Sequence, residues 1–308
     1  MIGVTAAVVA LIAPVGLSAC SSRDGGDTAA SSTPAPASGG CPTTPVNVVV
    51  SVDQWGDIVS ELGGECATVT TVLASSSVDP HDFEPSPADA ATFARAQLVV
   101  VNGADYDPWA LKFAATSAPK APVVDAGEVT KTAEGSNPHL WYSPSAVTAV
   151  ADAVTAELVK LAPEGKGYFA DRRAAFNTSL EPYDTLLADI KAGATGKTYA
   201  ATESVFDYTA EDAGLVNATP QGYRTASANE SDPSPADLEA FRRALADRTI
   251  SVLIYNAQTE GSVPEQIRIA AEAAGVPVVE VTETVPPGTT SFEAWQIAQL
   301  ATLAKALG

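Results

Sequence analysis

The feature of this 308-residue sequence that most constrains its fold is a regular alternation of short apolar, β-branched runs with amphipathic, alanine-rich stretches. Four apolar runs precede residue 130 and four follow residue 195: 47–53, 67–74, 97–102, 121–126, 197–202, 215–219, 250–256 and 276–282. Runs of strand length that alternate with helical stretches are typical of parallel β-sheets with helices on their faces. The sequence therefore predicts an α/β fold with two lobes, each built on its own parallel sheet.

The predicted helices carry recognisable start signals. Serine is followed by proline at Ser86-Pro87, Ser143-Pro144 and Ser234-Pro235. A serine side chain accepts a hydrogen bond from the N–H groups that are left over at a helix start, and proline is favoured at the first helical position. We therefore expect a helix to begin at each of these prolines.

A single long helix is expected to join the two lobes. Apolar residues between 166 and 192 recur mostly three and four positions apart, as on one face of a helix: Phe169, Phe176, Leu180, Tyr183, Leu187 and Ile190. Pro182 lies inside this segment and removes a backbone hydrogen bond, so a kink is expected near Thr178 to Pro182. The expected order is an N-terminal lobe at 44–164, a connecting helix at 165–193 and a C-terminal lobe at 194–308.

The first 43 residues have the pattern of export and tethering segments. Residues 4–17 are apolar but too short to span a bilayer, so 1–19 are predicted to be a signal peptide, although no lysine or arginine precedes the apolar run. The sequence that ends at Cys20 resembles the bacterial lipobox, which implies that this cysteine is acylated. Residues 20–43 then form a flexible tether. We expect an extracytoplasmic protein that is lipid-anchored to the cell membrane.

The charge balance argues against nucleic acid as a partner. The chain has 17 basic and 37 acidic residues, which gives a formal net charge of −20, so phosphate backbones are repelled. An acidic surface is more often a solubility feature than a metal site, so the charge by itself carries little weight for cation binding.

Two cysteines remain once Cys20 is assigned to the lipid anchor. An even pair in an exported protein predicts a disulfide between Cys41 and Cys66, with two separate thiols as the alternative. A bond between them would hold the start of the first strand and stabilise the fold by about 3 kcal/mol.

Histidine occurs only twice in this chain, and both occurrences share a context. His81 and His139 each follow a proline in a loop after a predicted strand. The proline fixes the loop and so presents a neutral imidazole in a defined direction. Two imidazoles suit zinc, manganese or iron, but a tight site needs about four donors, and no cysteine cluster supplies the others. The remaining ligands should therefore be carboxylates.

The candidate carboxylates lie where strands of the second lobe end. Open α/β sheets bind ligands at the carboxyl ends of their strands. Glu203 directly follows the predicted strand 197–202, and Glu283 directly follows 276–282. Glu280 lies inside that last strand and competes with Glu283 for the fourth position, since alternate strand residues face opposite sides.

Two segments make the sequence resemble a known family. VDPHDFEPSPAD at 78–89 and NPHLWYSP at 137–144 resemble the histidine motifs of metal-binding, zinc- and manganese-type substrate-binding lipoproteins of ABC transporters, known as cluster A-I. The resemblance covers about residues 44–308. It implies two lobes on one long connecting helix, a metal ion buried at their interface, a monomer, and an ABC permease with its ATPase as partners.

The resemblance also implies a role for each candidate ligand. His81 and His139 match the first two ligands of the family. The segment around Glu203 resembles the third-ligand segment, in which zinc-type members tend to carry histidine and manganese-type members glutamate. The segment around Glu283 resembles the last-ligand segment, where aspartate is usual, so a glutamate here departs from the family pattern. Glu230 is a candidate acceptor for the spare N–H of a ligand, with an ordinary loop as the alternative.

These observations predict a receptor, without catalytic residues, that captures one Zn²⁺ or Mn²⁺ ion as cargo for import. Two carboxylates favour manganese, but zinc binds such nitrogen and oxygen donors more tightly, so the metal stays open. Because a long helix resists wide hinge opening, release should involve local rearrangement of the Glu203 and Glu283 loops. The alternatives are a surface adhesin with a metal site and an exported zinc metallohydrolase, for which the sequence has no HExxH or GxSxG motif.

Overall fold

The computed structural model describes residues 40–74, 83–133, 135–229, 231–259 and 261–308. Cys20 with the predicted signal peptide and most of the tether, His81 and Glu230 lie outside the described residues. Within the described part, the chain forms two separate four-stranded sheets. Both sheets are parallel, and both have the same order, in which the first strand in the chain lies between the second and the third.

The strands coincide with the apolar runs of the sequence to within one residue at their starts, or lie inside them, which confirms the predicted pair of α/β lobes. The first sheet contains β1 (Val46–Val52), β2 (Ala67–Leu73), β3 (Leu98–Val101) and β4 (Val123–Asp125). The second contains β5 (Thr198–Ala201), β6 (Val216–Asn217), β7 (Val252–Asn256) and β8 (Val278–Val281). Because the strands are parallel, their carboxyl ends meet at one edge of each sheet, where loops can bring ligand side chains together.

The helices begin where the capping signals predict. The side chains of Ser86, Ser143 and Ser234 each accept a hydrogen bond from a backbone N–H three residues later. The helices are α1 (Asp53–Gly63), α2 (Pro87–Phe93), α3 (Pro108–Ser117), α4 (Ala126–Thr130), α5 (Pro144–Leu161), α6 (Lys166–Ala194), α7 (Asp207–Asp212), α8 (Gln221–Ala228), α9 (Pro235–Ala246), α10 (Ser262–Ala274) and α11 (Phe292–Leu307). Short 3₁₀ helices include η3 (Leu140–Tyr142) and η5 (Ser204–Phe206).

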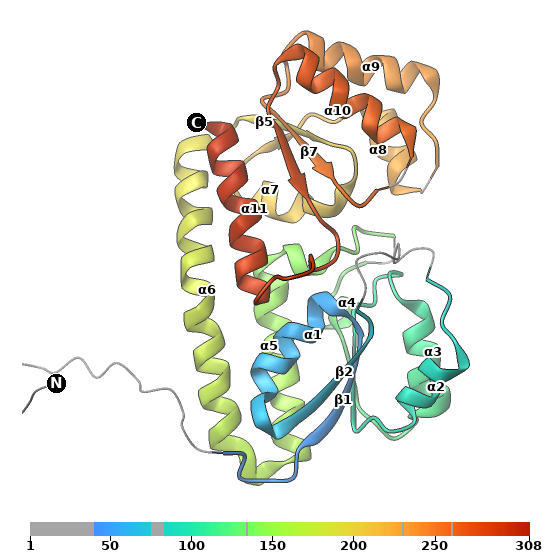
Figure 1. Ribbon diagram of the computed structural model, residues 1–308, viewed down its shortest axis with the longest axis vertical. Coiled ribbons are helices and arrows are strands. Elements are labelled where there is room, and N and C mark those ends of the chain that lie inside the picture. The colour runs from blue at the N-terminus through green and yellow to red at the C-terminus, as the bar shows by residue number, and fades with distance from the viewer. Residues whose placement is uncertain (1–39, 75–82, 134, 230, 260) are drawn as a thin grey trace, which may run out of the picture. The chain divides into compact units, whose positions relative to one another are not determined.

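The long helix α6 runs for 29 residues and continues through Pro182. Its apolar face is buried as the spacing predicts, with the side chains of Phe169, Phe176, Leu180, Tyr183, Leu187 and Ile190. This face packs on α1 and α5 of the first lobe and on α11, which follows the last strand (Figure 1). One hydrophobic core therefore extends along α6 from the first sheet to the second.

Hydrogen bonds also join the two lobes directly. The side-chain amide of Asn137 donates to the carbonyl of Ser204 at 2.8 Å, and the hydroxyl of Tyr208 donates to the carbonyl of Asn137 at 2.8 Å. The hydroxyl of Tyr142 donates to the carbonyl of Thr282 at 2.6 Å. These bonds fix the loops at the carboxyl ends of the two sheets against each other.

A disulfide joins Cys41 to Cys66, whose Cα atoms are 5.1 Å apart. It ties the residues that precede β1 to the turn that precedes β2. The sequence predicts this pair, because the third cysteine, Cys20, is assigned to the lipid anchor.

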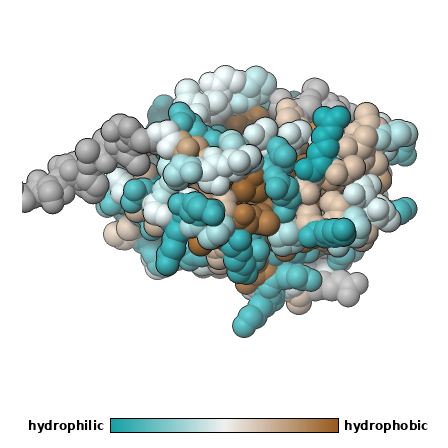
Figure 2. Space-filling model, turned by 90° about the horizontal axis from the view of Figure 1, so that it is seen from below, coloured by the Kyte–Doolittle hydropathy of each residue, from teal (hydrophilic) through white to brown (hydrophobic). Residues whose placement is uncertain are grey.

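Figure 2 shows one face that is mostly hydrophilic, with a small hydrophobic group near its centre. In the part of the chain that the structure describes, no helix combines the length and the apolar character needed to cross a membrane.

Candidate metal centre

His139 is held by its neighbour Asn137 in the loop between α4 and η3. The side-chain oxygen of Asn137 accepts from the backbone N–H of His139 at 3.0 Å and lies 2.6 Å from its Nδ1. The amide nitrogen of Asn137 is turned away and donates to Ser204, so the oxygen is the atom that faces the ring. An amide oxygen only accepts, so Nδ1 carries a proton, and in the neutral ring the lone pair is then on Nε2. His139 is therefore presented as a metal ligand through Nε2.

Glu283 meets that nitrogen from the other lobe. It lies in the loop after β8, and its Oε1 atom is 3.5 Å from Nε2 of His139. The two residues are 4% and 3% exposed. The backbone N–H of Glu283 donates to Gln258 at 2.7 Å, and its carbonyl accepts from Gln54 at 2.9 Å. The backbone of Glu283 is thus held by contacts on both sides of the lobe interface.

Tyr106 donates to the same carboxylate oxygen. Its hydroxyl lies 2.8 Å from Oε1 of Glu283, and its ring makes edge contacts with His139 and Trp141. Burial raises the pKa of Tyr106 well above its usual value, and the nearby Glu283 adds to this shift. The phenol therefore stays protonated and acts as a hydrogen-bond donor to the carboxylate.

A tight turn after β3 directs Tyr106 into the site. The side chain of Asp107 accepts from the backbone N–H groups of Asn102 and Gly103, both at 2.8 Å. Gly103 has a φ of 67°, and a Cβ atom there would lie 1.9 Å from a carboxylate oxygen of Asp125, so only glycine fits. The side chain of Asn102 donates to the carbonyl of Pro138 at 2.9 Å. The turn that holds Tyr106 is therefore tied to the loop that holds His139.

Glu203 follows β5, as the sequence predicts, but it is held away from the other candidates. Its Oε2 atom accepts from the side-chain amide of Asn256 at 2.8 Å and from the hydroxyl of Thr259. In the described residues, the ligand atoms of Glu203, His139 and Glu283 do not form a group within 4.8 Å of one another. The structure thus brings His139 and Glu283 together and leaves Glu203 bound to its own lobe.

Glu280 occupies a different place from its competitor. It lies on β8 beside Tyr255 of β7, and its side chain is exposed. It lines a shallow surface pocket and not the His139 side of the loop. Alternation along the strand therefore separates Glu280 from the buried pair, whereas Glu283 lies beyond the strand end.

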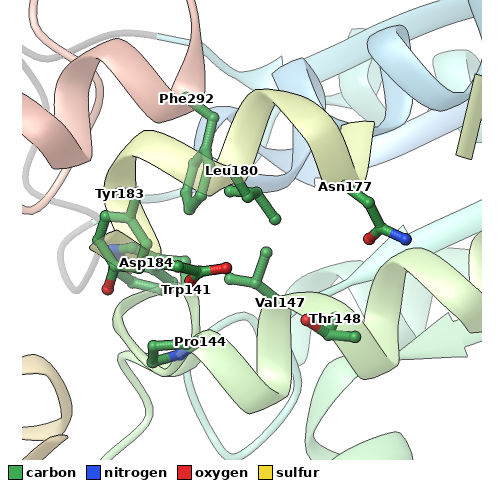
Figure 3. A pocket seen from close by; sticks show the side chains of 9 residues that line it. All are labelled: Trp141, Pro144, Val147, Thr148, Asn177, Leu180, Tyr183, Asp184 and Phe292. Atoms are coloured by element: carbon green, nitrogen blue, oxygen red, sulfur yellow. The ribbon is translucent and has the colours of Figure 1, made fainter. Parts of the chain in front are cut away.

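Trp141 separates this pair from a neighbouring cavity. Its ring lies 5.4 Å from that of His139, measured between centroids. On another side it lines a cavity of about 140 Å³ between η3, α5 and α6, which Phe292 of α11 also lines (Figure 3). The indole is buried, so its fluorescence should respond to changes at His139.

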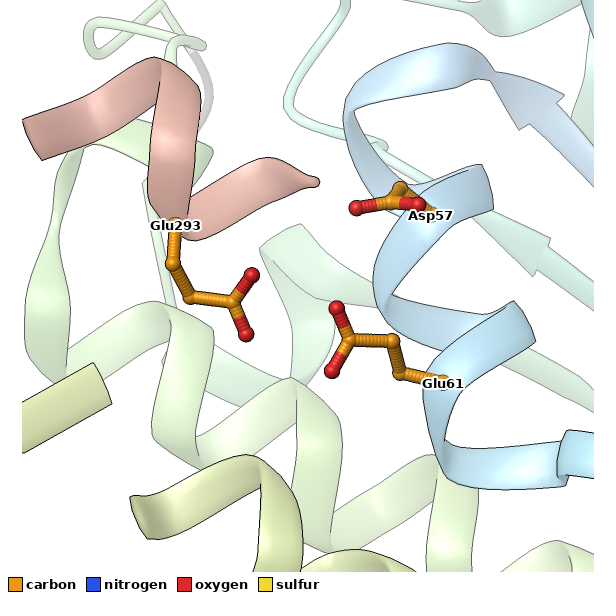
Figure 4. Close-up of side chains that lie close together, drawn as sticks. All are labelled: Asp57, Glu61 and Glu293. Atoms are coloured by element: carbon orange, nitrogen blue, oxygen red, sulfur yellow. The ribbon is translucent and has the colours of Figure 1, made fainter. Parts of the chain in front are cut away.

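A second group of acidic side chains lies outside the candidate site. Asp57 and Glu61 of α1 and Glu293 of α11 have carboxylate oxygens within 4.8 Å of one another (Figure 4). Asp57 accepts from the backbone N–H of Phe292, and Glu293 accepts from the hydroxyl of Ser179. Burial, followed by the negative charge of Glu293 and Asp57, raises the pKa of Glu61 to about 8. This cluster therefore holds a proton at neutral pH.

The sequence reasoning missed Tyr106, Gln54 and Asn256. A signal for all three exists, because Asn256 ends β7, Gln54 lies two residues after the end of β1, and Tyr106 lies in the turn that follows β3, all at the carboxyl edge of a parallel sheet.

The chain matches one family over most of its length. Residues 48–306 match the family described as ZnuA, zinc-uptake complex component A periplasmic. Similar curated proteins include the high-affinity zinc uptake system protein ZnuA of Bacillus subtilis, 26% identical over 208 residues, which are 60% of this chain and 62% of that protein. The manganese-binding lipoprotein MntA of Halalkalibacterium halodurans is 23% identical over 47% of this chain and 49% of its own length. The chain thus spans less than two thirds of either relative.

Solved structures share the fold. The crystal structure of a ZnuA superposes with a TM-score of 0.71 at 21% identity, over 86% of this chain and all of that one. The solute-binding protein FpvC of Pseudomonas aeruginosa, in complex with Mn²⁺, gives a TM-score of 0.71 at 22% identity, over 86% of this chain and 98% of that one. At these identities the likeness establishes the two-lobed fold on a long helix.

Proposed function

The chain belongs to the family of zinc-uptake complex component A, and on that premise we propose that it captures one divalent transition-metal ion between its lobes for import. The proposed ligands are His81, His139, Glu203 and Glu283, two from each lobe. The observation that most supports this is the buried pair His139 and Glu283, whose Nε2 and Oε1 atoms are 3.5 Å apart across the lobe interface.

The chemistry of this pair fits a metal ion. The neutral ring of His139 offers the lone pair of Nε2, because Nδ1–H donates a hydrogen bond to the side-chain oxygen of Asn137. Zinc binds nitrogen and oxygen donors at about 2.0–2.2 Å, so two ligands of one tetrahedral ion lie about 3.4 Å apart. The separation of Nε2 from the carboxylate oxygen of Glu283 matches that spacing.

Glu203 needs to move to complete the site. Its carboxylate is now bound to Asn256 and Thr259. Capture then involves a local rearrangement of the loop after β5, and release is the reverse step. This agrees with the hydrogen bonds between the lobes, which resist a wide opening of the interface.

The proposed setting is the outside of the cell membrane. The lipobox-like sequence supports a lipid anchor at Cys20, and several relatives are named lipoproteins. An ABC permease and its ATPase would receive the ion from a monomeric receptor. The family consists of solute-binding receptors, so neither the metallohydrolase nor the adhesin gains support from it.

The metal is Zn²⁺ or Mn²⁺, since similar proteins are named for each. Elemental analysis combined with competitive titration by both ions tests the proposal. The purified protein should bind one tight equivalent, and the Glu203→Ala and His81→Ala variants should each lose it. Glu164→Gln, at an exposed position that is not among the proposed ligands, is the control and should keep the tight equivalent of metal.

Two results would contradict this function. The wild-type protein could bind no stoichiometric metal, in which case the histidine and glutamate motifs serve only the fold. Alternatively, both ligand variants could retain the tight equivalent, in which case the metal binds at another place.

A further inference from the structure

The loop that carries Glu283 is held from the first lobe by the start of α1. Gln54 is fully buried, and its side-chain amide donates to the carbonyl of Glu283 at 2.9 Å. The carboxylate of its neighbour Asp53 accepts from the backbone N–H of Val285. Two adjacent residues of one lobe thus bind the backbone of the loop that follows β8 in the other.

The second lobe holds the same residue from the other side. The side-chain oxygen of Gln258 accepts from the backbone N–H groups of Glu283 at 2.7 Å and of Thr284 at 2.9 Å. The side-chain amide of Gln258 donates to the hydroxyl of Thr284 at 2.7 Å. The N–H of Glu283 is therefore bound by its own lobe, and its carbonyl is bound by Gln54 of the first lobe.

Gln54 also fixes the direction of the hydrogen bond between Tyr106 and Glu283. The side-chain nitrogen of Gln54 lies 3.4 Å from the hydroxyl oxygen of Tyr106. An amide N–H only donates, so the hydroxyl accepts there and gives its own proton to Oε1 of Glu283 at 2.8 Å. The two N–H groups of one amide thus reach the backbone of Glu283 and the phenol that contacts its carboxylate.

These contacts are made while Glu283 already lies beside His139. Oε1 of Glu283 is 3.5 Å from Nε2 of His139, the spacing of two ligands of one tetrahedral ion. Capture of the ion therefore needs no displacement of the Glu283 backbone, in contrast to Glu203. The bonds from Gln54 belong to the arrangement that receives the ion.

We propose that Gln54 is a positioning residue that places Glu283 for the metal ion before the ion arrives, so that a first-lobe side chain outside the ligand set contributes to the affinity. This rests on the proposed function, since Glu283 must be a ligand. A ligand that is held in its bound position loses less conformational freedom when the ion binds, and this strengthens binding. Groups that orient metal ligands typically contribute tenfold to a hundredfold in affinity.

The test compares two buried glutamines in the whole protein. Gln54→Met keeps a side chain of similar length and loses both N–H donors. Gln296→Met is the matched control, because Gln296 of α11 is 1% exposed and neither polar atom of its side chain has a hydrogen-bond partner among the described residues. Dissociation constants are measured by competition with a chromophoric chelator, for whichever of Zn²⁺ and Mn²⁺ the wild type binds more tightly. Gln54→Met should weaken binding by roughly tenfold, and Gln296→Met should keep the wild-type value.

A double substitution separates positioning from a loss of structure. Gln54→Met combined with Tyr106→Phe should weaken binding by less than the product of the two separate effects, because both residues act through Glu283. Separate effects that simply multiply, an unchanged dissociation constant in Gln54→Met, or an equal loss in Gln296→Met would overturn the proposal. If Gln54→Met does not fold, Gln54→Leu is measured in its place and judged by the same comparisons.

The wild-type protein tells the two proposals apart. If it binds neither ion tightly, the proposed function itself fails and the role of Gln54 falls with it. A tight wild-type site that Gln54→Met leaves unchanged would instead keep the proposed function and overturn only the positioning role.

Discussion

The hydroxyl of Tyr106 donates a hydrogen bond of 2.8 Å to Oε1 of Glu283, across 177 residues of sequence and from one lobe to the other. The same oxygen is 3.5 Å from Nε2 of His139. A residue of the first lobe thus orients the proposed ligand of the second. The site is assembled by the lobe interface, and neither lobe holds its geometry alone.

Tyr106→Phe should weaken metal binding by roughly tenfold to a hundredfold, because it removes a hydrogen bond that orients a ligand and keeps the ring. Isothermal titration with the preferred metal measures this effect. Tyr168→Phe is the matched control, since its hydroxyl accepts from the backbone N–H of Glu65, a turn remote from the site. An equal loss of affinity in both variants would mean that Tyr106 acts only through the stability of the fold.

Glu283→Ala should abolish the tight metal equivalent, whereas Glu280→Ala should retain it. The reason is position, because Glu283 is buried beside His139 and Glu280 is exposed on β8. Metal content after dialysis measures the difference. Loss of metal in the Glu280 variant with retention in the Glu283 variant would reverse the assignment of the fourth ligand.

Much of the fold was predictable because local rules dominate it. Apolar runs of strand length such as 47–53, and serine caps such as Ser143, depend on neighbours within a few residues. The same local reasoning placed Glu283 just beyond a strand end, where ligands collect. It did not decide between Glu280 and Glu283 as the fourth ligand, because a shift of one residue in strand register changes the face on which a side chain lies.

The parts that sequence reasoning missed depend on contacts between distant segments. Gln54 reaches the carbonyl of Glu283 over 229 residues, and no spacing in the sequence marks that pair. The acidic cluster is similar, since Glu293 of α11 meets Asp57 and Glu61 only because both helices pack on α6. Such pairs follow from the packing of whole helices and not from local patterns.

Replacing Cys41 and Cys66 together by alanine should lower the free energy of unfolding by about 3 kcal/mol, as expected for a bond that closes a loop of 25 residues. Urea denaturation of the oxidised wild-type protein and of the variant measures the difference. Metal affinity at a temperature where both are folded should be unchanged, because the described contacts of the site do not include the disulfide. A weaker metal affinity at full folding would contradict this separation.

Glu61→Gln should stabilise the protein at alkaline pH. Burial and the charges of Glu293 and Asp57 raise the pKa of Glu61 from its ordinary value of 4.5 to about 8, while Arg172 opposes the shift. Between these values the folded state binds more protons than the unfolded state, so stability falls as the pH rises from 4.5 to 8. The glutamine keeps the neutral form, and above pH 8 it should gain about 1–2 kcal/mol after allowance for solvent screening.

Urea denaturation of Glu61→Gln at pH 5 and at pH 8.5 checks this sign. The variant and the wild type should be similar in stability at the lower pH and differ at the higher one. Glu164→Gln, at an exposed position, should show no such dependence. A gain of the same size at both values would assign the effect to packing and not to the proton.

Metal binding should change the loops at the site and leave the lobe interface in place. Hydrogen exchange of the metal-free and metal-bound protein measures both. The loop after β5 should gain protection, because Glu203 must leave Asn256 or draw that residue with it to reach His139. Backbone N–H groups along α6 should exchange equally slowly in both states, since this helix packs against both lobes through one continuous core.

A rigid rotation of one lobe would instead loosen the contacts of Tyr142 with Thr282 and of Asn137 with Ser204 in the metal-free state. Higher exchange at η3 and along α6 in that state would therefore contradict release by local loop movement.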